Sequence, residues 1–208
     1  MELMQSGIIP SLSDVAQAAH VSRATAYRCF PTQAALVQAA VDEALGPILR
    51  WTPDAPEGSR RVADLFAFAY PRMQAYEATH RAALLMALDQ WTRRQAGTLG
   101  NEAPIVRGNR KALLKAATAP FREGMSEATL ERLTQSLSLM FGIESIVVLR
   151  DIWRLNPEET SRLALWAANA LVQAAVAESR TPADVDAGTR KRKRSPPLAR
   201  EIGATQEA

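Results

Sequence analysis

The chain contains few of the residues from which disulfides and metal sites are built. Its 208 residues include one cysteine, Cys29, and two histidines, His20 and His80. A single cysteine excludes an intrachain disulfide and a cysteine zinc cluster. Two histidines far apart in the sequence do not form a metal-binding motif either, so we expect neither a metal ion nor another cofactor.

Long apolar runs are absent as well. No run reaches the roughly 18 residues that a membrane span needs, and residues 1–11 lack the basic patch and apolar stretch of a secretory signal. These absences predict a cytoplasmic protein with no membrane partner. Hydrophobic residues make up 47% of the chain and charged residues 23%, which is typical of a folded protein with a sizeable core.

Positive charge is scarce near the N-terminus. Residues 1–50 hold the arginines Arg23, Arg28 and Arg50 against four acidic residues, and the whole chain has a net charge of +3. Charge alone therefore does not indicate a nucleic-acid-binding protein. A DNA-binding face in this region has to rely on few charges, backbone amides and hydroxyl groups. The basic run 190–194 fits either a solvated tail or non-specific attraction to phosphate.

The spacing of apolar residues predicts an all-α fold. Capping residues Ser11, Ser22 and Thr32 predict three short helices within residues 11–46, with Asp14 completing a capping box and Gly46-Pro47 ending the third helix. A further helix is expected from residue 59 to a kink or end at Pro71. Others are expected at 77–95, 105–122, 126–155 and 158–178. No alternating pattern is long enough to indicate a sheet.

The expected domains follow from these helices. Residues 1–46 form a three-helix domain, 47–58 a linker, 59–180 a second helical domain and 181–208 a disordered tail rich in small and charged residues. The helices near 126–155 and 158–178 are too long and apolar for one protomer's core to cover all round. They are therefore expected to form a homodimer interface.

The segment 11–30 has the layout of a helix-turn-helix, whose second helix lies in the major groove of DNA. At the tip of that helix Arg23 and Thr25 are candidate base or phosphate contacts, and the Ala24 methyl can meet a thymine methyl. Tyr27 is a candidate phosphate donor. The full set of expected DNA contacts is Ser11, Ser22, Arg23, Ala24, Thr25, Tyr27, Arg28, Thr32 and Gln33.

This segment resembles the signature of the TetR (tetracycline-repressor-like) family of transcription regulators. The matching residues are Asp14, Val15, Ala16, Ala19, Val21, Ser22, Thr25, Tyr27, Phe30 and Leu36. The resemblance implies a dimeric repressor that binds a near-palindromic double-stranded operator and is released by a small hydrophobic molecule. It also implies a ligand pocket in the second domain, for which the candidate residues are Phe66, Tyr70, Met73, Met86, Trp91, Phe141 and Glu144.

Three departures from the family pattern bear on function. The usual turn glycine is His20, a residue that tolerates the positive φ of such a turn better than most. The family often has a phosphate-binding lysine where this chain has Gln33. Its first helix normally has three or more turns, whereas only Met1 to about Gln5 precede Gly7 here. A missing helix is expected to expose apolar surface and impair DNA binding.

Alternative interpretations stay open at this point. The aromatic and methionine residues of the middle helices fit a core as well as a pocket, and Glu144 fits a paired structural acid as well as a ligand contact. The main rival function is a ligand-binding or scaffolding dimer with a degenerate helix-turn-helix. A helical enzyme is a weaker rival, since no residues form a recognisable catalytic motif, and we do not expect catalysis.

Overall fold

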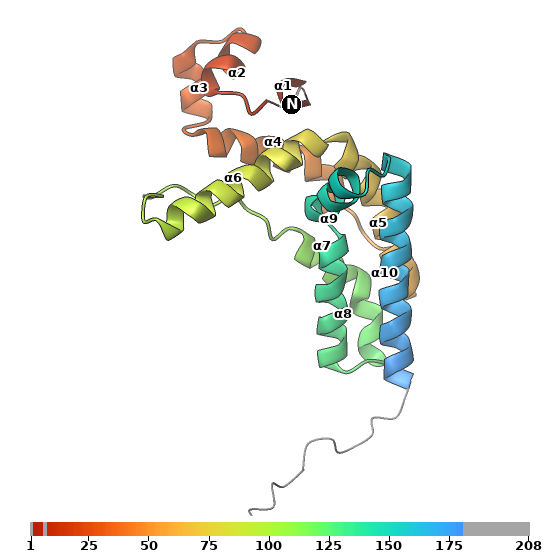
Figure 1. Ribbon diagram of the computed structural model, residues 1–208. Coiled ribbons are helices and arrows are strands. Elements are labelled where there is room, and N and C mark those ends of the chain that lie inside the picture. Colours follow the sequence, from red (N-terminus) through yellow and green to blue (C-terminus); the bar gives the residue numbers. More distant parts are fainter. Residues whose placement is uncertain (1, 6–7, 181–208) are drawn as a thin grey trace, which may run out of the picture.

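The computed structural model describes residues 2–5 and 8–180, and every regular element within them is a helix. The predicted all-α fold is therefore confirmed for this part of the chain. Helices α5, α7, α8 and α10 form an upright bundle, α4 and α6 cross its upper end, and α2 and α3 lie above them (Figure 1). The elements are α1 (Glu2–Gln5), α2 (Leu12–Ala18), α3 (Arg23–Cys29), α4 (Gln33–Leu49), α5 (Gly58–Ala75), α6 (Glu77–Gln95), α7 (Arg110–Thr118), the 3-10 helix η1 (Ala119–Glu123), α8 (Glu127–Met140), α9 (Ile143–Val147), the π-helix η2 (Val148–Ile152) and α10 (Pro157–Arg180).

The first helices begin at the predicted capping residues. Ser11 Oγ accepts a hydrogen bond from the Asp14 backbone N–H at 3.1 Å, and the Asp14 carboxylate accepts one from the Ser11 N–H at 2.8 Å, which is the expected capping box. These hydrogen bonds hold the pKa of Asp14 below its usual value. Ser22 caps α3 and Thr32 caps α4, so all three predicted helix starts are confirmed.

The main core lies between α5 and the helices packed around it. The ring of Phe66 lies 5.2 Å from that of Phe141, edge to face, and 5.8 Å from that of Tyr70. Small residues on α10 let its backbone approach α5 closely. The buried residues of the two helices are Val62, Leu65, Phe66, Ala69, Tyr70 and Met73 on α5, and Ala164, Ala168, Val172 and Ala175 on α10.

Helix α4 runs past Gly46-Pro47, where the sequence predicted its end, and stops at Leu49. Pro47 has no N–H, so the carbonyl of Glu43, four residues earlier, lacks its helical partner. The Arg72 guanidinium on α5 replaces that N–H by donating to Glu43 O at 3.0 Å, and it also donates to Ala44 O at 2.6 Å. The prediction was wrong because this contact comes from a distant segment.

Other predicted helix ends are also wrong. Helix α5 continues through Pro71 to Ala75, and the carbonyl that this proline leaves unpaired belongs to Ala67, an exposed residue that water can reach. The helix expected at 105–122 begins only at Arg110. The residues before it are held outside a helix, because Ile105 N–H donates to Gln90 Oε1 at 3.0 Å and Val106 N–H donates to a side chain of α4.

The segment expected as one helix over 126–155 is broken at Gly142. This glycine has φ +157°, and the axes of α8 and of residues 143–152 differ by 48°. The break turns the second half of the segment across the upper end of the bundle (Figure 1). The predicted helix at 77–95 is confirmed as α6, and the one at 158–178 is confirmed as α10.

Helices α4 and α6 connect the N-terminal helices to the bundle. A second buried cluster joins Met4 of the one-turn α1 to α4 and α6, and it consists of Met4, Val37, Val41, Ala82 and Ala83. The predicted linker 47–58 thus starts inside the last turn of α4. The tail predicted to be disordered, 181–208, lies outside the described residues.

Candidate functional site

The solvent face of α3 carries most of the predicted DNA contacts. Arg23, Ala24, Tyr27 and Arg28 are exposed, and at about 3.6 residues per turn they fall on one side of the helix. Ala26 is buried on the other side. Tyr27 is 52% exposed, so it is a surface residue and not part of the core. Thr25 is half-buried at the edge of this face.

The predicted hydroxyl contacts serve as helix caps. Ser22 Oγ accepts the Thr25 N–H at 3.1 Å and lies 2.9 Å from Thr25 Oγ1. Thr32 Oγ1 accepts the Ala35 N–H at 3.0 Å, and Ser11 caps α2 in the same way. Each cap uses an oxygen lone pair, so the hydroxyl protons of Ser11 and Thr32 can still be donated to a phosphate oxygen.

The turn between α2 and α3 has the backbone conformation that the sequence predicted for its glycine position. His20 has φ +53°, so the expected positive φ is confirmed. The turn closes through hydrogen bonds from His20 N–H to Gln17 O at 3.2 Å and from Val21 N–H to Ala16 O at 3.0 Å. A side chain in this region costs about 1–2 kcal/mol, so His20 strains the turn without opening it.

Gln33, a predicted DNA contact, hydrogen-bonds within the protein in this structure. Its Nε2 donates to Pro10 O at 3.0 Å and to Ile9 O at 3.5 Å, so both amide protons are used within the protein. The side chain thereby ties the segment before α2 to the start of α4. In this arrangement Gln33 offers no donor to phosphate.

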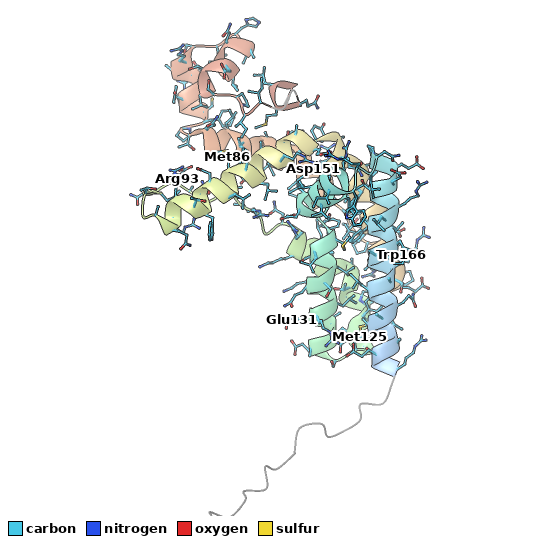
Figure 2. All side chains as sticks on the ribbon, in the orientation of Figure 1. Met86, Arg93, Met125, Glu131, Asp151 and Trp166 are labelled. Carbon is cyan, nitrogen blue, oxygen red and sulfur yellow. The ribbon has the colours of Figure 1, made fainter. Side chains whose placement is uncertain are left out.

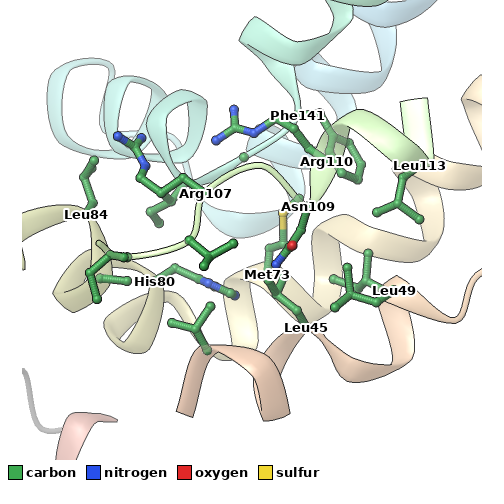
Figure 3. Close-up of a pocket in the computed structure, with 17 residues that line it drawn as sticks. Leu45, Leu49, Met73, His80, Leu84, Arg107, Asn109, Arg110, Leu113 and Phe141 are labelled. Carbon is green, nitrogen blue, oxygen red and sulfur yellow. The ribbon is translucent and has the colours of Figure 1, made fainter. Parts of the chain in front are cut away.

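A cavity of about 90 Å³ lies between α4, α6 and the start of α7 (Figure 3). Its walls are mainly apolar and include Leu45 and Ile48 of α4, Met73 of α5 and Leu113 of α7. The polar lining residues are His80, Arg107, Asn109 and Arg110.

His80 is buried, and its ring points into the middle of the cavity (Figure 3). Its Nε2 has no hydrogen-bond partner among the described residues. Burial is the larger cause and the positive charge of Arg72 the smaller, and together they lower the pKa of His80 to about 4. The imidazole is therefore neutral at pH 7 and presents one donor and one acceptor nitrogen.

Glu144 is a paired acid at the edge of the cavity. Its two carboxylate oxygens accept hydrogen bonds from Arg110 NH2 at 2.7 and 2.8 Å, and Arg107 NH2 binds the same carboxylate. Burial works against ionisation, but the Arg110 hydrogen bond and the two guanidinium charges hold the pKa of Glu144 below its usual value. Arg110 also donates to Ser138 O at 2.9 Å, which anchors the pair to α8.

The structure brings together only part of the predicted ligand set. Met73 and Phe141 line the cavity, and Glu144 lies at its edge. Phe66 and Tyr70 lie instead in the core, where the Tyr70 hydroxyl donates to Met140 O. Met86, labelled on α6 in Figure 2, lines a separate open hollow, and Trp91 is 58% exposed.

Sequence reasoning missed the polar cavity residues. His80 is a lone histidine in an apolar helix, and Arg107 belongs to a segment predicted to be helical. The available signal was weak: two arginines three residues apart, Arg107 and Arg110, and a distant acid in an apolar segment, Glu144, that needed a partner. Nothing local in the sequence indicates that they meet Glu144.

Large apolar side chains are exposed on η2, just after it, and on α10. Ile152 is 70% exposed, Trp153 69% and Trp166 68%, and Val148 and Leu163 are also exposed. Trp166 lies on α10, the helix that packs on α5 and α8 (Figure 2). Tryptophan is enriched at protein–protein interfaces, so the exposure of Trp153 and Trp166 makes this region a candidate interface.

Among residues 2–5 and 8–180, no three His, Cys, Asp or Glu side chains come together as a metal ion requires. In the same residues no single helix is long and apolar enough to cross a membrane, and only the bent pair of α8 with residues 143–152 reaches that length and hydropathy jointly. No family model, curated protein or solved structure matches the chain.

Proposed function

We propose that this chain is a cytoplasmic, dimeric transcription regulator that reads DNA with α3 and is controlled by a small molecule in the cavity. The observation that carries the proposal is the helix pair α2–α3, with its strained His20 turn and the exposed face of α3. Two short capped helices joined by a tight turn, with a solvent-facing second helix, have the form of a helix-turn-helix.

The α3 face has suitable chemistry for DNA. Arg23 and Arg28 supply guanidinium donors for guanine or phosphate, and Ala24 supplies a methyl contact for thymine. Tyr27 adds an exposed hydroxyl for phosphate. The logarithm of the DNA affinity falls with the logarithm of the salt concentration, with a slope of about −0.9 for each phosphate contact. Because few charges are involved, the total slope is shallow.

The exposed residues on η2 and α10 support a homodimer. Trp153 and Trp166 are the side chains most favoured at the centres of protein interfaces, and here they stand in water. When this surface pairs with the same surface of a second protomer, both tryptophans are buried and the resulting dimer has two copies of α3. A dimer of this kind fits two half-sites of a near-palindromic operator.

The position of the cavity beside α4 can couple ligand binding to DNA binding. Helix α4 forms one wall with Leu45 and Ile48, and the same helix is capped by Thr32, close in the chain to the end of α3. A ligand that fits better when α4 and α6 separate shifts the population toward that geometry. The two α3 helices then no longer match the spacing of the operator, so the protein acts as a repressor released by its ligand.

Selection from a pool of randomised duplexes tests this function directly. We expect the full chain to enrich a near-palindromic sequence whose half-sites lie about one helical turn, about 34 Å, apart. A protein with Arg122→Ala, which removes an exposed arginine on η1, should select the same sequence. Failure to enrich any sequence at low salt contradicts the proposal.

One observation favours a second function, a ligand-binding or scaffolding dimer that does not bind DNA. Gln33 occupies the position of a phosphate-gripping lysine, and its donors are used by Ile9 and Pro10. That function predicts a dimer in solution with no enriched sequence, and the duplex selection separates the two.

A further inference from the structure

We infer that the cavity selects a compact, apolar monoanion, such as a short branched or aromatic carboxylate, whose anionic group binds Arg107 at the rim. The inference rests on the proposed function only in treating this cavity as the effector site. The reasons are the sign of the lining groups, the charge balance at the rim and the size of the space.

The polar groups of the lining favour an electron-rich ligand. They are two arginines, an asparagine and a neutral histidine, and no carboxylate lines the cavity. The buried Nε2 of His80 has no hydrogen-bond partner among the described residues, so a polar ligand atom that reaches it gains a hydrogen bond. Such a lining disfavours a cationic ligand and favours one that accepts hydrogen bonds.

The charge balance of Arg107, Arg110 and Glu144 at the rim leaves one positive charge. Arg107 and Arg110 share a single acid, Glu144. Arg72 is not part of this balance because it does not line the cavity, and its guanidinium binds backbone carbonyls and lies 4.9 Å from the Tyr76 ring centroid. A ligand with one negative charge restores neutrality at the rim.

The two arginines are not equally available. Arg110 is held by both oxygens of Glu144 and by Ser138 O. Arg107 binds Glu144 through NH2 alone among the described residues, so its other N–H groups can be donated to a ligand. Both guanidinium groups lie at the side of the cavity and not in its middle (Figure 3). The carboxylate therefore binds at the rim, and the apolar part extends toward Leu45 and Met73.

The size of the cavity limits the ligand. Its volume of about 90 Å³ is less than the roughly 150 Å³ of an apolar cavity that holds benzene. A short branched chain fits this space, and a single ring fits with a small shift of the irregular residues 105–109. Long acyl chains do not fit.

Calorimetric titration of the full chain at pH 7 tests the inference with two matched pairs: isovalerate against isovaleramide, and benzoate against benzamide. Each pair differs in charge and hardly in shape. We expect each carboxylate to bind at least about tenfold more tightly than its amide, because one charge-assisted hydrogen bond contributes enough binding free energy for that difference. Arg107→Gln should abolish this preference, whereas Arg94→Gln, which removes an exposed arginine at the end of α6, should retain it.

Glu144→Gln provides a second check, because it removes the acid that competes for Arg107 and should strengthen carboxylate binding. Equal binding within the pairs, a preference that survives Arg107→Gln, or no binding of any of the four compounds overturns the inference. Thermal unfolding shows that each variant is folded. The DNA selection is independent: if it fails while the carboxylates bind, the proposed function fails and the ligand assignment stands, and the reverse outcome rejects only the ligand assignment.

Discussion

Replacement of His80 by leucine should remove a specific part of the pH dependence of stability. The imidazole is buried and has a pKa of about 4, against 6.5 for an ordinary histidine. The main cause is desolvation in an apolar cavity, to which Arg72 adds repulsion. The difference between 6.5 and about 4 corresponds to about 3 kcal/mol of folding free energy.

The direction of the pH dependence follows from whether His80 binds a proton in the unfolded and in the folded state. Between about pH 4 and 6.5 the unfolded chain holds a proton on His80 and the folded chain does not, so the free energy of unfolding rises with pH across this window. The native protein therefore loses stability as the pH falls from 7 toward 4, and the loss from this residue is complete near pH 4. Protonation in place would put a charge among Met73 and the other apolar walls.

This effect can be measured by urea unfolding at several pH values between 4 and 7, with the protein concentration held fixed. The stability difference between wild type and His80→Leu should change by about 3 kcal/mol over this range, with the wild type losing more toward acid. Contributions from carboxylates are common to both proteins and cancel. His20→Asn, which removes the exposed histidine, controls for the loss of a histidine as such. A stability difference that stays constant with pH would show that His80 titrates alike in the folded and unfolded chain.

Two further predictions concern the interface and the turn. The double substitution of Trp153→Glu and Trp166→Glu should convert the dimer to a monomer in light scattering, because it places charges on the exposed apolar surface. The control Leu85→Glu on α6 should leave the dimer intact. A wild-type protein that is itself a monomer contradicts this prediction. His20→Gly should raise the free energy of unfolding by about 1 kcal/mol, since glycine adopts the φ of +53° without strain; an unchanged or lower stability in urea argues against strain at this turn.

Local features were predictable from the sequence because their physics is local. The caps at Ser11, Ser22 and Thr32 each depend on a hydroxyl and a backbone N–H three residues apart. The positive φ of His20 likewise follows from the short connection between two helices. The exposed face of α3 could be placed because helical spacing puts Ala24 and Arg28 nearly opposite Ala26.

Features that depend on distant contacts were not predictable. Helix α4 passes through Pro47 because Arg72 supplies the missing donor from another helix. The cavity brings His80, Arg107 and Arg110 together from separate segments, while Phe66, chosen for its aromatic ring, lies in the core. Residue type indicated Phe66 as a candidate, but only packing decides whether an aromatic ring lines a core or a cavity.

The central claim is that α3 reads DNA, and fluorescence anisotropy with the selected duplex tests it most directly. We expect salt-dependent binding of the wild type and of Arg122→Ala, and a loss of about 1–3 kcal/mol per α3 in Arg23→Ala with relaxed sequence preference. Arg23 is exposed, so its loss should not disturb the fold, which thermal unfolding checks. Unchanged affinity and specificity of Arg23→Ala at physiological salt would contradict the assignment of α3 as the recognition helix.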